Sequence, residues 1–345
     1  MVFLLVKSFL VLKMLKKDPL QIIAFHSYGS NRHFYIRGRA LEDDSINLED
    51  KGWFKLLVNA FKRFESDEVK NVEINFRLPN DKVLKAKTDE HGYFKCEEYL
   101  DDLTTLTNEE GWLPVVASYS DVSIKRNIIN SNRFPAEILI PANDSEFGVI
   151  SDIDDTILHT GVVSRLKWRV LFNTFFKGAF SRTPLEGTAK FYHMLHRGKS
   201  GEKANPIFYV SHSPWNMYRY LEYFLKKNDF PKGPILLRSM NAIFKKKSQD
   251  EKPQKQKEII HILNAYPDFK FILLGDCGEY DADIYIEIAN TYPNRILTIY
   301  LRSVNHKKKM LRVKDLFKNY KKTPVLLVEK TEDAIVHARK HGFIK

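Results

Sequence analysis

Hydrophobic and polar residues alternate in several short segments of the first 145 residues, as they do in strands with one buried face. Turn signals at Pro79-Asn80-Asp81 and at Asp89–Gly92 precede further short strands. Short strands at this spacing predict a small β-sandwich, interrupted by a helix over 52–64. The predicted strands cover residues 33–37, 72–78, 83–84, 93–94, 112–120 and 134–140.

From about residue 146 the pattern changes to short apolar runs without alternation, which is typical of parallel strands buried on both faces. Helical segments lie between the runs, such as 186–196 and 216–227, and a last helix begins at Thr331 with Gly342 at its C-terminal cap. This order predicts a doubly wound α/β fold, in which ligands bind beyond the carboxyl ends of the strands. The runs cover residues 147–150, 206–210, 271–274, 296–301 and 324–328.

We therefore expect a β-rich domain over 18–145 and an α/β domain over 146–345, preceded by an apolar and basic segment over 1–17. The stretch 2–15 is too short to span a bilayer, and no small-residue cleavage site follows it. Its lysines fall on one half of a helical projection. A helix lying in a membrane surface and a helix packed on its own domain both fit this pattern.

Composition narrows the class of protein. A chain of 345 residues with 43% hydrophobic residues is long and apolar enough for about two packed domains, which excludes a disordered or fibrous protein. The two cysteines, Cys96 and Cys277, lie far apart and offer neither a disulfide framework nor paired zinc ligands. This usage fits a reducing compartment, so we expect a cytoplasmic protein, with a peripheral place on the inner membrane surface as an extension.

The excess positive charge sits at the two ends of the chain. The net charge is +12; residues 1–17 hold four lysines and no acid, and residues 306–345 hold twelve basic and four acidic residues. Residues 18–305 are balanced, with 39 of each sign. Charge placed in this way favours an anionic surface touched by the ends over a nucleic-acid channel through the body. Simple solubility is the alternative, and the sequence predicts no nucleic-acid or protein partner.

Polar residues follow three of the predicted buried strands, in the segments 151–156, 211–213 and 275–281. In a parallel sheet these segments meet at one edge. Four carboxylates there are unfavourable without a cation, and oxygen ligands of this kind suit Mg²⁺. The predicted metal ligands are Asp152, Asp154, Asp276 and Asp281.

The same residues suit phosphoryl transfer. One carboxylate attacks phosphorus, and a second, two residues on, protonates the leaving oxygen and later activates water. Ser211 donates to a phosphoryl oxygen, and a lysine before the third strand offsets the developing charge, with Lys255 preferred over Lys252 and Lys257. Strand-end turns with capping side chains are the structural alternative. Asp-x-Asp-x-Thr alone is a weak signal; the three segments in this order are a strong one.

The segments SDIDDT, YVSHSPW and LLGDCGEYDADIY, with Lys255 upstream of the last, resemble the four motifs of the haloacid-dehalogenase superfamily. In more detail, ISDIDDTILHTGV, RTPLEGTAKFYHML, FYVSHSPWN and QKQKEIIHIL resemble the phosphatidate phosphatase family of actin-patch-protein type over residues 146–303. The resemblance implies a Rossmann-like parallel sheet with helices on both faces. It also implies Mg²⁺-dependent release of phosphate from phosphatidate, to diacylglycerol, through an aspartyl phosphate.

The resemblance also assigns roles. Asp152 is the nucleophile and Asp154 the general acid and base. Asp276 completes the Mg²⁺ shell, together with the Asp152 carboxylate and the Asp154 backbone carbonyl, while Asp281 stands behind it. Ser211 and Lys255 are expected to hold the phosphoryl group. The predicted substrate contacts are Thr156, which supports the motif loop, His212, Ser213 and Trp215.

Several features leave alternatives open. His212 stands where the family suggests Asn, and Cys277 where Ser is commoner. Residues 160–182, rich in aromatic and basic side chains, form either a short cap over the site that contacts lipid or a helix of the core. Trp215 either flanks the substrate or closes the start of its helix.

Three functions of different class therefore stand at this stage. The first is a phosphatase that acts on phosphatidate or another anionic phospholipid at a membrane surface. The second is the same chemistry on a soluble phosphomonoester. The third is a membrane-binding module without activity, against which the complete set of acidic residues argues.

Overall fold

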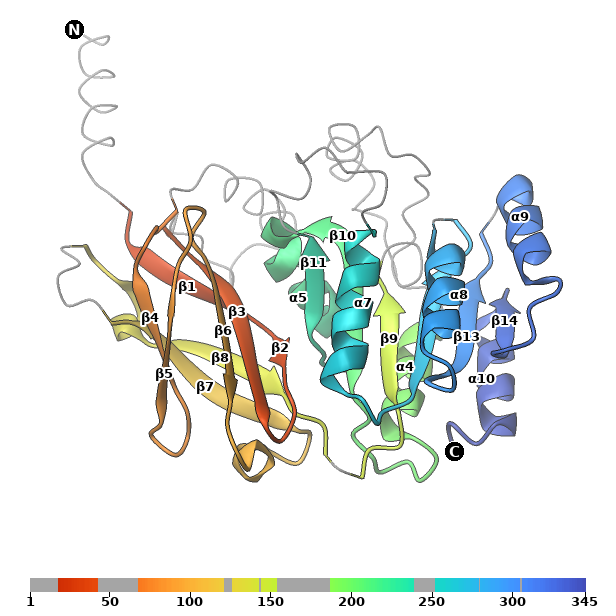
Figure 1. Cartoon of the computed structure of the whole chain (residues 1–345), viewed down its shortest axis with the longest axis horizontal. Coiled ribbons are helices and arrows are strands. Elements are labelled where there is room, and N and C mark those ends of the chain that lie inside the picture. The colour runs from red at the N-terminus through yellow and green to blue at the C-terminus, as the bar shows by residue number, and fades with distance from the viewer. Residues whose placement is uncertain are drawn as a thin grey trace, which may run out of the picture.

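The computed structural model describes residues 18–42, 68–120, 126–142, 144–153, 187–238, 252–278, 280–304 and 306–345. These residues form a β-sandwich, at the left of Figure 1, and an α/β part, at the right. The predicted helix over 52–64 and the segment 1–17 lie outside the described residues. Among the described helices, none is long and apolar enough to cross a bilayer.

The sandwich consists of two sheets. One has the strand order β1-β3-β6 and the other the order β2-β8-β7-β4-β5. Because side chains alternate along each strand, every second side chain points into a core that the two sheets share. This apolar core includes Phe34, Ile74, Phe94 and Ile138. The predicted sandwich is confirmed. The strands are β1 (Leu20–Phe25), β2 (Ser27–Tyr28), β3 (His33–Glu42), β4 (Glu73–Arg77), β5 (Val83–Lys87), β6 (Tyr93–Tyr99), β7 (Trp112–Tyr119) and β8 (Phe134–Leu139).

The α/β part is built on one parallel sheet of six strands in the order β11-β10-β9-β12-β13-β14. The strands that the sequence predicts are present, and β11 is an addition. The chain runs outward from β9 in one direction through β10 and then returns to β12 on the other side. A doubly wound sheet binds its ligand at such a reversal. The strands are β9 (Gly148–Asp152), β10 (Ile207–Pro214), β11 (Ile235–Arg238), β12 (Phe271–Asp276), β13 (Ile296–Arg302) and β14 (Val325–Val328).

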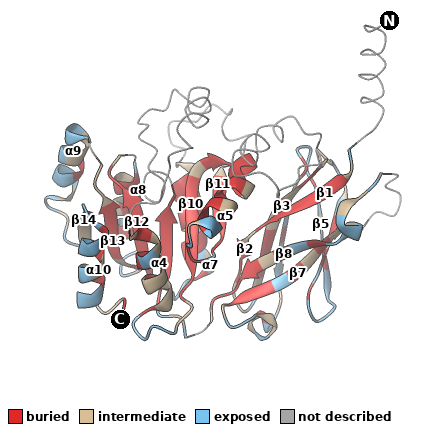
Figure 2. Ribbon diagram, turned by 180° about the vertical axis from the view of Figure 1, so that it is seen from behind, coloured by how far each residue is buried: buried red, intermediate tan, exposed pale blue. Residues whose placement is uncertain are grey.

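Helices cover both faces of this sheet. Side chains of each strand alternate between two apolar clusters, so that Val149 and Tyr209 face one side while Ile150 and Phe208 face the other. The strands are buried almost throughout, except for the edge strand β14, which is half-buried (Figure 2). One face carries α4 (Thr188–Arg197), α5 (Tyr218–Lys227) and α10 (Thr331–Lys340); the other carries α7 (Gln254–Ala265), α8 (Asp281–Thr291) and α9 (Lys307–Phe317).

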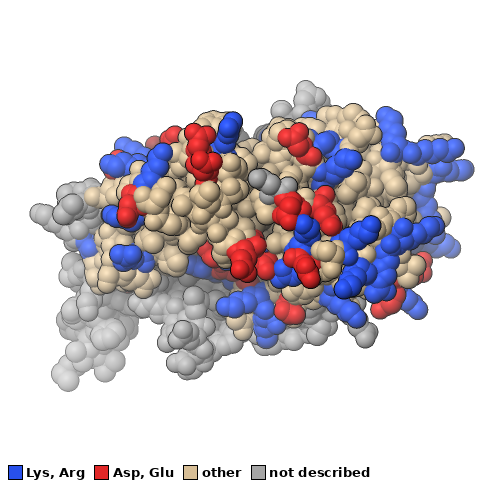
Figure 3. Space-filling model, turned by 90° about the horizontal axis from the view of Figure 1, so that it is seen from below, with Lys and Arg blue, Asp and Glu red and all other residues tan. Residues whose placement is uncertain are grey.

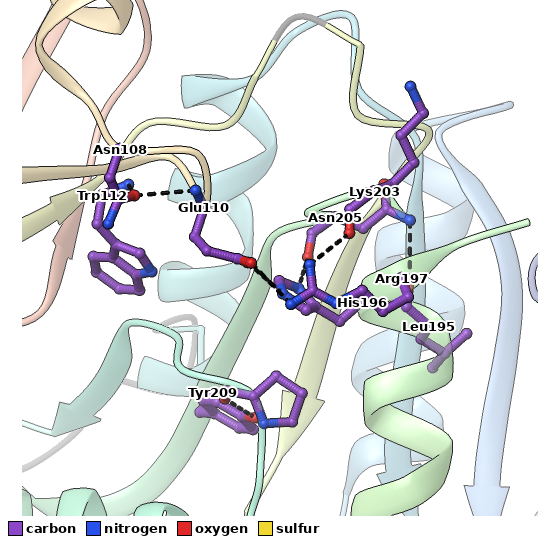
Figure 4. Close-up of polar contacts among 10 residues, drawn as sticks. Asn108, Glu110, Trp112, Leu195, His196, Arg197, Lys203, Asn205 and Tyr209 are labelled. Atoms are coloured by element: carbon purple, nitrogen blue, oxygen red, sulfur yellow. Dashed lines mark hydrogen bonds and ion pairs between the residues drawn. The ribbon is translucent and has the colours of Figure 1, made fainter. Parts of the chain in front are cut away.

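The sandwich and the α/β part are joined by a polar and aromatic interface. Near one end of it, Glu110 lies in the turn before β7, where the Asn108 side chain accepts hydrogen bonds from the backbone N–H groups of Glu110 and Trp112 (Figure 4). The Glu110 carboxylate lies 2.9 Å from Nε2 of His196 and accepts from Arg197 at 2.8 Å. Both partners belong to the last turn of α4, so an acidic side chain of the sandwich binds the basic end of a helix.

A second contact of this interface lies nearer the carboxyl edge of the parallel sheet. Arg37 of β3 donates two hydrogen bonds to Glu258 of α7, Nη1 to Oε1 at 3.2 Å and Nη2 to Oε2 at 3.4 Å. Its guanidinium also lies 4.3 Å from the ring centre of Trp215, which stacks on Phe25 of β1 at 4.2 Å. The sandwich is thereby in contact with both the segment after β10 and the first turns of α7.

Candidate active site

Three strands end in polar residues at the carboxyl edge of the parallel sheet. Asp152 ends β9, Asp276 ends β12, and Ser211 lies in the last half of β10. The strand register pairs Asp152 with Val210, directly before Ser211, so these residues lie at the same level. The predicted convergence of the polar segments at one edge is thus seen for the described residues.

Asp152, Lys255 and Asp281 form a buried charged group. Lys255 Nζ lies 2.6 Å from Asp152 Oδ1 and 2.6 Å from Asp281 Oδ1, and all three side chains are at most 1% exposed. Lys255 comes from the first turn of α7, which begins at Gln254. A lysine in the first turn of a helix is opposed by the helix dipole, so the two carboxylates must hold it in place.

The loop after β12 arranges Asp276 and Asp281. The backbone N–H of Asp276 donates to Asp281 Oδ2 at 3.3 Å, and that of Gly278 donates to Asp276 Oδ1. Asp281 opens α8, where a negative charge is favoured by the dipole. Gly275 makes the approach possible, because a Cβ there would lie 2.6 Å from Asp281 Oδ2.

The charge and ligand atoms of this group fit a divalent cation. Carboxylate oxygens of Asp152, Asp276 and Asp281 lie within 4.8 Å of one another, and all three residues are buried. Lys255 pairs with two of these carboxylates, and three carboxylates packed this closely still favour a bound cation. Hard oxygen ligands around a small space are the donors that Mg²⁺ takes. The predicted metal ligands among the described residues therefore fit such an ion.

The residues at the end of β10 and directly after it lie in two different places. Ser211 and Ser213 are buried at the edge, and the backbone N–H of Ser213 donates to Ser211 Oγ at 2.9 Å. His212 between them is half-buried. Trp215 lies elsewhere: it is 7% exposed and packs between Phe25 and Arg37 in the interface. For Trp215 the structure therefore supports the packing alternative.

Some predicted site residues fall outside the described part of the chain. They are Asp154, Thr156 and the proposed cap over 160–182. The roles given to them remain predictions.

Cys277 lies in the loop beside the carboxylates but is not a nucleophile. Its side chain is buried, and burial with the charges of Asp276 and Asp281 raises the pKa of the thiol to about 12. A thiol with this pKa is protonated at neutral pH and inert. Cys277 therefore serves as a small apolar side chain of the core.

Two tyrosines and an arginine near the site escaped the sequence reasoning. Tyr192 of α4 lies 2.5 Å from Ser151 Oγ in β9, the strand that ends at Asp152, and Tyr285 of α8 donates to the Leu274 carbonyl of the neighbouring strand β12 at 2.8 Å. Arg302, the register partner of Asp276, lines a small pocket together with Tyr192. Burial lowers the pKa of Arg302 from its usual value. In the sequence, the signal for Arg302 is its position at the end of the apolar run 296–301.

Comparison with known proteins agrees with this geometry. Residues 147–303 match the model of a family described as phosphatidate phosphatase APP1, catalytic domain. The phosphatidate phosphatase APP1 of Saccharomyces cerevisiae is 36% identical over 173 residues, which are 50% of this chain and 28% of the yeast protein. An uncharacterized protein of Schizosaccharomyces pombe is 26% identical over 271 residues, 78% of this chain and 41% of that protein.

The chain thus spans less than half the length of both relatives. A carbohydrate esterase structure, at 10% identity, covers 88% of this chain and 99% of its own with a TM-score of 0.23, too low to support an argument about fold. The matched region runs from β9 to the end of β13 and contains Asp152, Ser211, Lys255, Asp276 and Asp281. The similarity to the phosphatidate phosphatase APP1 catalytic-domain family therefore covers the candidate site and less than half of the chain.

Proposed function

We propose that this protein is a Mg²⁺-dependent phosphatase that releases phosphate from phosphatidate and leaves diacylglycerol. The observation that carries the proposal is the buried contact of Asp152 with Lys255, beside Asp276 and Asp281, inside the region that matches the family. We also propose that the α/β part is a domain of haloacid-dehalogenase type over 146–345 and the β-rich part a separate domain over 18–145.

The reaction proceeds in two displacements. A carboxylate oxygen of Asp152 attacks phosphorus, a bond forms between them, and the bond from phosphorus to the glycerol oxygen breaks. Asp154 gives its proton to that oxygen, and diacylglycerol leaves. Asp154 then takes a proton from water, whose oxygen attacks phosphorus, and inorganic phosphate leaves with Asp152 restored.

The side chains around Asp152 prepare it for this attack. Lys255 keeps Asp152 ionised at a contact of 2.6 Å and offsets charge on the phosphoryl oxygens. Ser211 donates to one of those oxygens. Asp152, Asp276 and the backbone carbonyl of Asp154 would hold Mg²⁺, and Asp281 would support these ligands. When bound, the ion offsets the repulsion between the carboxylates and the phosphate.

The choice of a lipid substrate rests on the family and on the surroundings of the site. Residues 160–182 would cover the site with aromatic and basic side chains, and the segment 1–17 would lie on an anionic membrane surface. A cytoplasmic protein held peripherally on the inner membrane surface fits these features. The same site would also serve a soluble phosphomonoester, which is the second candidate.

Phosphate release tests the proposal directly. Phosphatidate in mixed micelles, p-nitrophenyl phosphate and a panel of soluble phosphomonoesters are compared with Mg²⁺ and with EDTA. The proposal expects preference for phosphatidate, lost in EDTA and in Asp152→Asn. Preference for a soluble ester would keep the mechanism and overturn the substrate. Absence of turnover with every compound would favour a membrane-binding module without activity.

A further inference from the structure

Helix α9 has a buried face and an unusual exposed face. Met310, Val313 and Phe317 pack against the core on the α7 and α8 side of the sheet, as in an ordinary surface helix. On the opposite side Leu311 is 57% exposed. A large apolar side chain left in water on a helix that already has a packed face needs a reason.

Lysines surround Leu311. Lys307 and Lys308 lie one turn before it, Lys314 one turn after it, and Lys318 two turns after it, so that all four share its face of the helix. All are exposed, and the structure gives none of the four an ion pair with a described residue. Asp315 is the one acid of α9.

The other two basic residues of α9 bind the active-site loop. Lys309 Nζ donates to the backbone carbonyl of Gly278, two residues after Asp276. Arg312 Nη1 donates to both oxygens of Asp283, at 2.9 and 2.8 Å, two residues after Asp281. α9 is therefore tied to the loop after β12 and to the first turn of α8, and the helix lies toward the carboxyl edge of the sheet (Figure 1).

The C-terminal part of the chain is basic as a whole, since residues 306–345 hold twelve basic and four acidic residues. On the underside of the molecule, which is the side away from α9, Lys and Arg side chains also gather toward the C-terminal elements, at the right of Figure 3. An anionic surface is the complement of the four lysines around Leu311. The leucine at the centre of the lysines favours a lipid surface over a nucleic acid. An apolar side chain can insert between the lipids of a bilayer, whereas the phosphate backbone of a nucleic acid offers it no apolar surface.

We propose that α9 docks on the surface of an anionic phospholipid bilayer, with Leu311 between the headgroups and the four lysines on their phosphates. The docking then holds the carboxyl edge of the sheet at the bilayer. That part of the inference rests on the proposed function, whereas the binding itself does not.

Vesicle sedimentation tests the docking on the full chain, without turnover. Vesicles contain phosphatidylcholine with about a fifth phosphatidylserine, a charged lipid that is not a phosphomonoester substrate. Leu311→Asp and the double variant Lys307→Glu/Lys314→Glu should each weaken binding about tenfold or more. Matched controls are Val336→Asp, at a valine 66% exposed on α10, and Lys226→Glu/Lys227→Glu at the exposed end of α5. The controls should bind as the unaltered protein does.

Three results would overturn the docking surface. In the first, the α9 variants bind the vesicles as tightly as the unaltered protein does. In the second, the controls lose as much binding as the α9 variants. In the third, an oligonucleotide displaces the protein from the vesicles and its own binding requires the same lysines. Hydrolysis of p-nitrophenyl phosphate without vesicles separates this inference from the proposed function. The α9 variants should keep that rate, which also shows that they fold; failure of the unaltered protein to hydrolyse any ester would refute the function and leave the vesicle result standing.

Discussion

Lys255 is the cation that pairs with two carboxylates of the candidate site. It lies between Asp152 and Asp281 at 2.6 Å from each, and its side chain is fully buried. Removing one partner of a buried ionic group leaves the other charges without compensation and costs about 3–5 kcal/mol. Stability and chemistry therefore depend on the same cation.

We predict that Lys255→Met lowers the rate of phosphate release by about a hundredfold or more, because Asp152 loses the cation that keeps it ionised. It should also lower the free energy of unfolding. The control is Lys252→Met, since Lys252 is 45% exposed and its ion pair with Glu287 contributes little. Rates and urea unfolding of the two variants, measured together, decide the matter. A rate for Lys255→Met within a few-fold of the unaltered protein would remove this lysine from the mechanism.

Arg302 gives a second prediction at this scale. Arg302 is the register partner of Asp276, lines a pocket together with Gly275 and makes a hydrogen bond of 3.5 Å to Thr188. A cation there attracts an anionic substrate before the reaction begins. Arg302→Met should raise KM several-fold for a phosphomonoester and change kcat little. Lys330→Met, at an exposed position before α10, is the control. A fall in kcat at constant KM would contradict the role of Arg302 in binding.

At the scale of elements, the sandwich holds two parts of the active site in place. Arg37 of β3 is bonded twice to Glu258, one turn after Lys255, and lies over the ring of Trp215, four residues after Ser211. The side chains of Arg37 and Glu258 are 15% and 11% exposed. Through this contact β3 fixes the distance between the serine and the lysine that are proposed to hold the phosphoryl group.

We predict that Arg37→Met lowers kcat about tenfold, with a smaller effect on KM, because misplaced groups cost more in the transition state than in binding. Arg37→Lys should not restore the rate, since lysine cannot bond both oxygens of Glu258. The control, Arg39→Met on the same strand, removes a pair with Glu68 inside the sandwich. Equal rates for both arginine variants would mean that Arg37 only stabilises the fold.

A double-mutant cycle sharpens this test. Arg37→Met, Glu258→Gln and the double variant are compared in kcat. Coupled residues give a double variant that is less damaged than the product of the single effects implies. Independent effects on kcat would contradict the positioning role.

The sequence predicted the elements better than the contacts between them. Alternation along β4 and β7 and the apolar runs of β9 and β12 indicated strands because burial has a period in the sequence. β11 has four residues and α8 begins inside the acidic motif, so neither has a clear pattern of its own.

The candidate site was largely predictable, and its supports were not. Asp152, Ser211 and Asp276 follow buried strands, so the parallel topology alone brings them together. The contact of Lys255 with Asp281 depends on how α7 and α8 pack, which spacing does not encode. Trp215 and Arg37 are 178 residues apart in the chain. Their contact follows from tertiary packing, for which a single sequence holds no local signal.

At the scale of the whole molecule, the sandwich and the α/β part are held together by charged groups of both. Glu137 of β8 forms an ion pair with Lys232 of the α/β part at 2.5 Å. His26 of the sandwich lies 3.5 Å from Glu137 and 3.4 Å from Glu222 of α5. Lys232 precedes β11 and also lies 4.2 Å from the ring centre of Trp112. Because of ion pairs at this interface, the stability of the contact between the sandwich and the α/β part depends on pH.

The hydrogen bonds from His26 and Lys232 lower the pKa of Glu137 from 4.5 to about 2. A carboxyl with a lowered pKa adds stability above its unfolded value, and this part is lost as the pH falls from about 4.5 to about 2. We predict that the unaltered protein is more stable than Glu137→Gln at pH 6 and that the difference shrinks toward zero over this range. Glu137 is 36% exposed, so solvent screening keeps the difference to about 1 kcal/mol. Urea unfolding across the range measures it, with Glu90→Gln, at an exposed turn before β6, as the control. A difference that stays constant between pH 6 and pH 3 would show that Glu137 does not link the two parts through its charge.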